Sequence, residues 1–218
     1  MPVSSNGGAG QGSVVMTDAI AGPSADQTRV LSAAMSDYVQ LTKPRIVVMI
    51  LITTAATAMI GAGGVVPIAE LCWLLIGTAA VAASAGAANQ VWERSIDRRM
   101  TRTSTRPLPA GRVRTMPATV YTALLGVAGT ALLHVMFGPI PALAGAVTWS
   151  MYVFVYTPMK TRSAWNTTVG AVAGALPVMI GYTAIGGSLS EWTGWLLVGV
   201  LVAWQYPHFM AIAWMYRR

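Results

Sequence analysis

The sequence has few charged residues and a single cysteine. Charged side chains make up 10% of its 218 residues, against about 25% in an ordinary soluble domain, while hydrophobic residues make up 55%. This balance excludes a water-soluble fold of this size, because too much apolar surface would stay uncovered. With Cys72 as the only cysteine, an internal disulfide framework is excluded as well. No Lys or Arg precedes Arg29, so the basic start of a cleaved signal peptide is not expected.

Six apolar runs are long enough to cross a membrane. A helix needs about 17 to 25 largely apolar residues to span the hydrocarbon core of a bilayer. Lipid cannot satisfy free backbone groups, so each run is expected to be helical, and small residues such as those at 82–88 allow close helix packing. We therefore predict an all-α, polytopic membrane helical bundle with spans at about 46–61, 68–91, 118–137, 140–156, 167–185 and 192–215.

The first 36 residues differ from the rest of the chain. They are rich in Gly, Ser and Ala, a composition typical of flexible segments. We predict that residues 1–36 form a flexible cytoplasmic tail and that residues 37–218 form one transmembrane domain.

The positive charges predict the orientation of this domain. If the six spans alternate, all 14 Lys and Arg residues fall on one side of the membrane, and the loops near Gly63, Gly138 and Gly187 carry none. By the positive-inside rule, that side is the cytoplasmic side of the cell's inner membrane, and both termini lie there. The net charge of +7 then needs no nucleic-acid partner, because the topology and one arginine-rich loop account for it.

Two carboxylates stand at the cytoplasmic end of the second run. Glu93 and Asp97 are four residues apart and follow Asn89 at the same interval, so on a helix their oxygens share one face. Such hard oxygen ligands suit Mg²⁺. Arginines follow, among them Arg102 and Arg106, and their forked donors suit a diphosphate. The plainer alternative is that the two acids only balance neighbouring arginines at a membrane surface.

Two further observations favour a binding site. Asn89 is a polar residue inside an apolar run, where polar groups are costly and tend to have a role. The segment Tyr-Thr-Pro-Met-Lys at 156–160 places the phenol of Tyr156 and the ammonium of Lys160 on the same side of the membrane. Both groups could meet the same anion.

Taken in order, these motifs resemble the UbiA prenyltransferase superfamily. The elements that carry the resemblance are Asn-x3-Glu-x3-Asp at 89–97, Arg-Thr-Ser-Thr-Arg-Pro-Leu-Pro at 102–109 and Tyr-Thr-Pro-Met-Lys at 156–160. Further segments are similar to the branch of this family that farnesylates haem, namely Lys-Pro-Arg at 43–45, Trp-Asn-Thr at 165–167, Gly-Ala-Leu-Pro at 174–177 and Trp-Gln-Tyr-Pro-His-Phe at 204–209. The resemblance runs from about Leu41 to Arg218.

The resemblance implies a Mg²⁺-dependent enzyme of the lipid bilayer that transfers a farnesyl group from farnesyl diphosphate to haem b, giving haem O. The implied catalytic and metal residues are Asn89, Glu93 and Asp97, with Lys160 as a further catalytic cation and Arg102, Arg106, Tyr156 and His208 as substrate-binding residues. For His208, a role in helix packing stays open as the alternative. Many family members carry Asp at the position of Glu93, which leaves direct and water-mediated metal contact both open.

One feature of the family is missing from the sequence. The family typically has nine transmembrane helices and a second acidic motif after the sixth, whereas this sequence stops at Arg218. We therefore expect six of the nine helices in a truncated or fragmentary chain. Two alternatives stay open, namely a non-catalytic membrane remnant and a prenyltransferase that acts on another aromatic acceptor. A transporter fits less well, because the polar residues cluster at one face.

Overall fold

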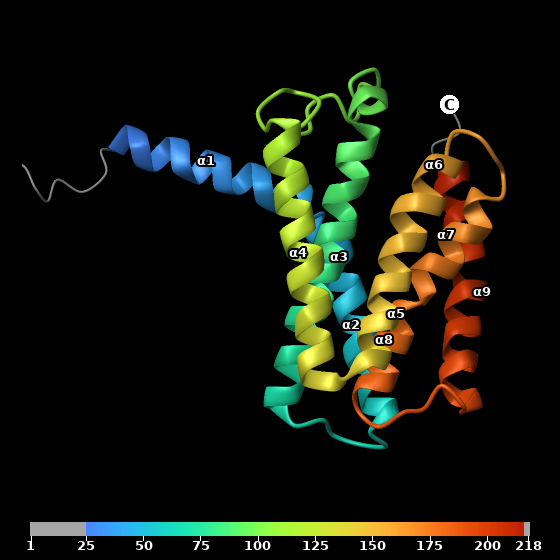
Figure 1. The fold of residues 1–218 in the computed structure, drawn as a ribbon. Coiled ribbons are helices and arrows are strands. Elements are labelled where there is room, and N and C mark those ends of the chain that lie inside the picture. Colours follow the sequence, from blue (N-terminus) through green and yellow to red (C-terminus); the bar gives the residue numbers. More distant parts are fainter. Residues whose placement is uncertain (1–24, 216–218) are drawn as a thin grey trace, which may run out of the picture.

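The computed structural model describes residues 25–215, and within them it is an all-α bundle without strands (Figure 1). The first part of the predicted tail, residues 1–24, lies outside the described residues. The helices are α1 (Ala25–Leu41), α2 (Pro44–Gly61), α3 (Ile68–Asp97), α4 (Thr115–Phe137), α5 (Pro139–Ser150), α6 (Thr157–Met159), α7 (Asn166–Ala175), α8 (Pro177–Ala184) and α9 (Trp192–Met215).

Five helical stretches of the described residues have the length and hydropathy needed to cross a membrane. They are Pro44–Gly61, Ile68–Asp97, Thr115–Phe137, Pro139–Met159 and Asn166–Ala184, which match the first five predicted spans within a few residues at most ends. The sixth prediction corresponds to α9, a helix of 24 residues that runs alongside α7 (Figure 1). The predicted helical membrane bundle is therefore confirmed, and the protein is a multi-pass membrane protein.

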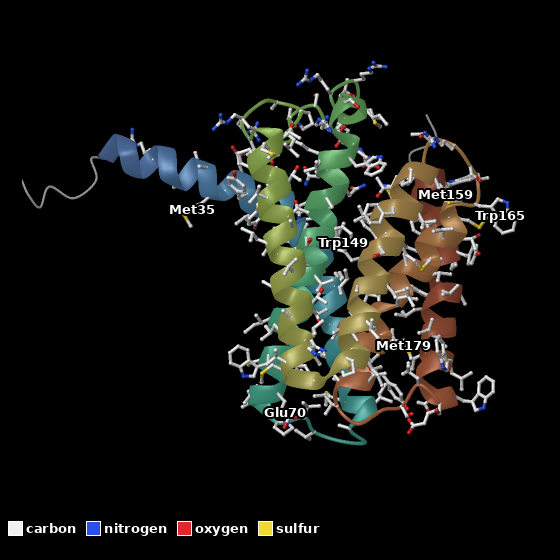
Figure 2. All side chains as sticks on the ribbon, in the orientation of Figure 1. Met35, Glu70, Trp149, Met159, Trp165 and Met179 are labelled. Carbon is white, nitrogen blue, oxygen red and sulfur yellow. The ribbon has the colours of Figure 1, made fainter. Side chains whose placement is uncertain are left out.

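The loops that carry the cations lie at one end of the bundle. The α3–α4 loop and the α6–α7 loop are both at the top of Figure 1, whereas the α2–α3 and α8–α9 loops are at the bottom. Glu70, in the first turn of α3, marks the opposite end (Figure 2). The spans thus alternate in direction, and the described cations lie at the end of the bundle where this alternation was predicted to place them. Arg217 and Arg218 lie outside the described residues.

The predicted boundary between tail and domain at residue 36 falls inside the helix α1. The helix α1 is continuous from Ala25 to Leu41 and crosses that boundary without a break. Its C-terminal part is held by the bundle, because Leu41 is fully buried against Ala87 and its neighbours. Contacts with distant segments therefore override a composition that is typical of a linker.

The fifth span departs from a regular α-helix close to its end. A π-helical turn, Met151–Tyr156, joins α5 to α6, and Pro158 follows two residues later. Proline has no backbone N–H, so it cannot donate to the preceding turn. The carbonyl of Tyr152 accepts from the backbone N–H of Thr157 and also, at 2.8 Å, from its hydroxyl. Such wide turns often occur at functional sites, and this one sets the positions of Tyr156 and Thr157.

Helices α3 and α4 pack closely because small residues face each other. A Cβ atom added to Gly129 of α4 would lie 2.8 Å from the Cβ of Ala80 and 2.8 Å from the backbone nitrogen of Val81 in α3. Two hydrogen bonds add specificity, since the indole of Trp149 donates to the hydroxyl of Ser84, which donates to the Thr122 carbonyl. These contacts tie α3, α4 and α5 together.

Gly129→Ala is expected to destabilise the bundle by about 1–3 kcal/mol, because the new methyl group overpacks the α3–α4 contact. The measurement is the midpoint of thermal unfolding in detergent. Gly199→Ala in α9 is the matched control, since a Cβ atom there meets nothing within 4 Å. Equal midpoints for the two variants would contradict the close contact.

Candidate active site

A cavity of about 570 Å³ opens at the end of the bundle where the arginine-rich loop lies. It is formed by the last turns of α3, the following loop and the segment around α6. Among its lining residues are all the predicted site residues except His208, namely Asn89, Glu93, Asp97, Arg102, Arg106, Tyr156 and Lys160. Residues far apart in the sequence thus meet in one cavity.

Each of the two carboxylates faces a cation. The ammonium of Lys160 lies 3.0 Å from Oε1 of Glu93, and it also lies 4.8 Å from the centroid of the Tyr156 ring. A guanidinium nitrogen of Arg106 lies 2.7 Å from Oδ2 of Asp97, whose side chain is only 5% exposed. Paired charges of this kind tolerate burial, whereas a lone buried charge would not. The site therefore holds a dense set of charges of both signs at a membrane surface.

Asn89 is fully buried and uses both ends of its amide. Its Oδ1 accepts a hydrogen bond from the ammonium of Lys43, and its Nδ2 donates to the hydroxyl of Thr157 at 3.1 Å. The Thr157 hydroxyl gives its own hydrogen to the Tyr152 carbonyl, so it can only accept from Asn89. This fixes the orientation of the amide. Asn89 therefore links the turn before α2 to the π-helical turn of the fifth span.

Lys43 lines the cavity, although the sequence motifs alone did not assign it to the site. It has φ 55° and ψ 60°, a left-handed conformation that is unusual for a residue with a side chain. Such strain persists only where the surroundings hold it in place. In the sequence it begins the Lys-Pro-Arg segment at 43–45, directly before an apolar run, and that segment carried no assigned role in the site.

Two residues of α3 hold the Lys43 turn in place. The amide of Gln90, 2% exposed, donates to the carbonyls of Gln40 and Leu41 at 3.2 and 3.1 Å, at the end of α1. Gly86 lets the turn lie close to α3, because a Cβ atom on Gly86 would lie 3.0 Å from the Thr42 carbonyl oxygen. The strained turn thus follows from long-range contacts with α3.

The surroundings of Lys43 weaken its hold on a proton. Burial, helped by the nearby cations Lys160 and Arg106 and opposed by Glu93 and Asp97, lowers the pKa of its ammonium to about 8. An anion that enters the cavity favours the protonated form of a nearby amine. Binding of an anion would therefore raise the pKa of Lys43 and keep its amine protonated.

The cavity offers two carboxylates to a divalent cation. Mg²⁺ is bound in proteins by one or two carboxylates, with water and phosphate oxygens completing its shell. Glu93 and Asp97 fit that donor set, although within residues 25–215 no group of three Asp, Glu, His or Cys side chains surrounds one point. A metal contact through Oδ1 of Asn89 would require Lys43 to move away. In the present arrangement, Oδ1 of Asn89 accepts a hydrogen bond from Lys43 instead.

His208 is not brought to this cavity. Its side chain is exposed on α9, where its ring lies 6.1 Å from that of Phe209. The cavity also contains Trp92 and Thr103, which lie within the motifs at 89–97 and 102–109, and Arg162, which lies in none of the motifs. Trp92 follows Asn89 by three residues, so its helical register was the available signal.

Comparison with known proteins assigns the chain to a family. Residues 50–218 match the UbiA prenyltransferase family. A protein named protoheme IX farnesyltransferase from Rhodopirellula baltica is 60% identical over 82% of this chain and 62% of that protein. One of the same name from Solibacter usitatus is 40% identical over 84% of this chain and 65% of that protein. The chain thus spans less than two thirds of the length of these relatives.

Solved structures share the fold. The structure of a UbiA homologue from Archaeoglobus fulgidus bound to DMAPP and Mg²⁺ superposes with a TM-score of 0.68 at 18% identity, covering 79% of this chain and 62% of that one. A structure of digeranylgeranylglyceryl phosphate synthase gives a TM-score of 0.68 at 15% identity, covering 78% and 59%. With a family match over most of its length and a relative at 60% identity, this chain belongs to the UbiA prenyltransferase family.

Proposed function

We propose that this chain carries the diphosphate site of a protohaem IX farnesyltransferase, which transfers a farnesyl group from farnesyl diphosphate to haem b and yields haem O. The observation that carries the proposal is one cavity at the membrane surface, where two carboxylates lie among five cations, one of which is Arg162. The other four cations are Lys43, Arg102, Arg106 and Lys160, and the carboxylates are Glu93 and Asp97. The shared name of the relatives from Rhodopirellula baltica and Solibacter usitatus supports haem as the acceptor.

The reaction needs an allylic C–O bond to break with both electrons leaving on the diphosphate. A new C–C bond then forms to a vinyl carbon of haem, water supplies a hydroxyl group to the other vinyl carbon, and a proton is released. No nucleophilic side chain is required. The contribution of the protein is to stabilise the departing negative charge with preorganised donors. Lys43 and Lys160 are suited to this role, because neighbouring groups hold both ammonium ions in place.

Mg²⁺ is the proposed cofactor, with Glu93 and Asp97 as the residues that would hold it. When bound, it would neutralise part of the charge on the diphosphate. The Archaeoglobus fulgidus homologue, solved with DMAPP and Mg²⁺, supports this assignment. Arg106 and Lys160 are now paired with these acids, so both cations lie where they can turn toward an incoming diphosphate. Asn89 positions Lys43, and the phenol of Tyr156 lines the same cavity.

The proposed orientation places the arginine-rich loop in the cytoplasm of a cell with the bundle in its inner membrane. The separation of the described cations to one end of the bundle supports this orientation through the positive-inside rule. The bilayer would then deliver the apolar farnesyl chain, while the charged diphosphate stays at the aqueous surface. His208 remains a proposed contact for haem.

The test uses a chimera in which this chain is followed by the part of the Rhodopirellula baltica relative that lies beyond the matched region. Expression in a bacterium without its own haem O synthase should yield haem O, detected by mass spectrometry of extracted haems. The control is the same chimera with Lys160→Met, which is expected to yield far less because a cation for the diphosphate is lost. A membrane-inserted chimera that leaves only haem b would refute the proposal, and a prenylated product other than haem O would assign a different acceptor.

A further inference from the structure

The helix α1 has a direction unlike that of the spans. In Figure 1 it extends sideways from the bundle, at the level of the end that carries the arginine-rich loop. The spans cross the bilayer, so a helix at their end that points across them lies along the membrane surface. Its composition fits such a place, because Ser, Ala, Asp and Gln are interspersed with apolar residues such as Met35 and Val39.

The two faces of α1 point to different surroundings. Met35 is 70% exposed and Val39 is 54% exposed, and their spacing of four residues places them on one face. Figure 2 shows Met35 pointing toward the level of the spans, away from the arginine-rich loop. Asp37, about 200° around the helix from Met35, forms an ion pair with Arg112 of that loop at 3.0 Å. The apolar face thus looks toward the hydrocarbon and the polar face toward the charged loop.

This orientation is fixed by the bundle. The Tyr38 ring packs edge-to-face on Tyr121 of α4, with ring centroids 5.1 Å apart. Leu41 is fully buried, and Gln90 caps the last carbonyls of the helix. A helix held at its C-terminal end by these contacts cannot rotate to hide Met35.

We infer that α1 is an interfacial helix that lies on the bilayer surface, with Met35 and Val39 inserted among the lipids. The occupant of this face is lipid, because the face is continuous with the bilayer that surrounds the spans and has the same apolar character. Insertion of the helix also fixes the start of the turn that places Lys43, since only Thr42 separates Lys43 from the end of α1.

Single cysteines provide the test, in a background where the exposed Cys72 is replaced by Ala. Met35→Cys and Val39→Cys probe the apolar face. Ala33→Cys is the matched control, because Ala33 is exposed on the opposite face of the same helix. Each variant is labelled with a nitroxide, and the protein is placed in nanodiscs of phosphatidylcholine and phosphatidylglycerol. Power saturation then compares collisions with oxygen, which concentrates in lipid, and with a water-soluble nickel complex.

The expected result is a several-fold higher ratio of oxygen to nickel accessibility at positions 35 and 39 than at position 33. Equal ratios at the three positions would place α1 in water and overturn the inference. Protection of position 35 from both reagents would also overturn it, because protein, such as a second copy of the chain, would then cover this face. Val39→Cys keeps the inference testable if Met35→Cys fails to fold.

Discussion

Asp97→Asn is expected to lower haem O formation by the chimera on the order of 10²-fold or more. The substitution keeps the shape of the side chain but removes the charge that would hold Mg²⁺ beside the diphosphate. The fold should survive, because the amide oxygen can still accept a hydrogen bond from Arg106, which now lies 2.7 Å from Oδ2. The measurement is the initial rate of haem O formation in membranes with equal amounts of inserted protein.

The same helix offers a matched control for this prediction. Glu70→Gln also removes one acidic charge from α3, but at the opposite end of the bundle (Figure 2), so its rate should stay close to that of the unchanged chimera. Glu93→Gln should behave like Asp97→Asn, because both carboxylates line the cavity. A rate for Asp97→Asn equal to that for Glu70→Gln would remove Asp97 from the proposed metal site.

The parts of the site that depend on local periodicity could be predicted from sequence. Asn89, Glu93 and Asp97 follow one another at intervals of four, and α3 continues as a helix through Asp97, so all three line one cavity. The same holds for the spans, whose lengths are set by the thickness of the bilayer. In these cases the physical constraint acts within a single segment of the chain, and the sequence of that segment is enough to predict it.

The remaining parts depend on contacts between distant segments. The left-handed conformation of Lys43 is held by Gln90 and Asn89 of α3, and neither residue is near it in sequence. The π-helical turn at Met151–Tyr156 has no local pattern that distinguishes it from the apolar run around it, apart from Pro158. The helix α1 has the composition of a flexible tail, but its end is buried against the bundle. No periodicity encodes these features, which is why the motifs missed them.

Lys43→Met is expected to weaken the binding of farnesyl diphosphate by about 10- to 100-fold, because a charge-assisted hydrogen bond contributes about 1.5–3 kcal/mol and each 1.4 kcal/mol changes the affinity tenfold. Methionine has nearly the length of lysine, so the substitution removes the charge and leaves the packing of the turn largely intact. Binding of a non-hydrolysable thio analogue of farnesyl diphosphate to the chimera in nanodiscs, followed by calorimetry in the presence of Mg²⁺, measures the change.

Two further variants separate charge from position. Arg45→Met removes a cation two residues away that lines the neighbouring crevice between α1 and α2, so it should leave the affinity close to unchanged if net charge alone is not the cause. Gln90→Leu keeps the charge of Lys43 but removes both caps on the end of α1, which frees the strained turn and should weaken binding in the same direction as Lys43→Met. Unchanged affinity in Lys43→Met would show that this ammonium does not meet the diphosphate. Equal losses of affinity in Arg45→Met and Lys43→Met would instead assign the effect to the overall positive potential of the membrane surface. The charges of Lys43 and Arg45 lie two residues apart, so only a specific contact with the diphosphate would make their removal differ.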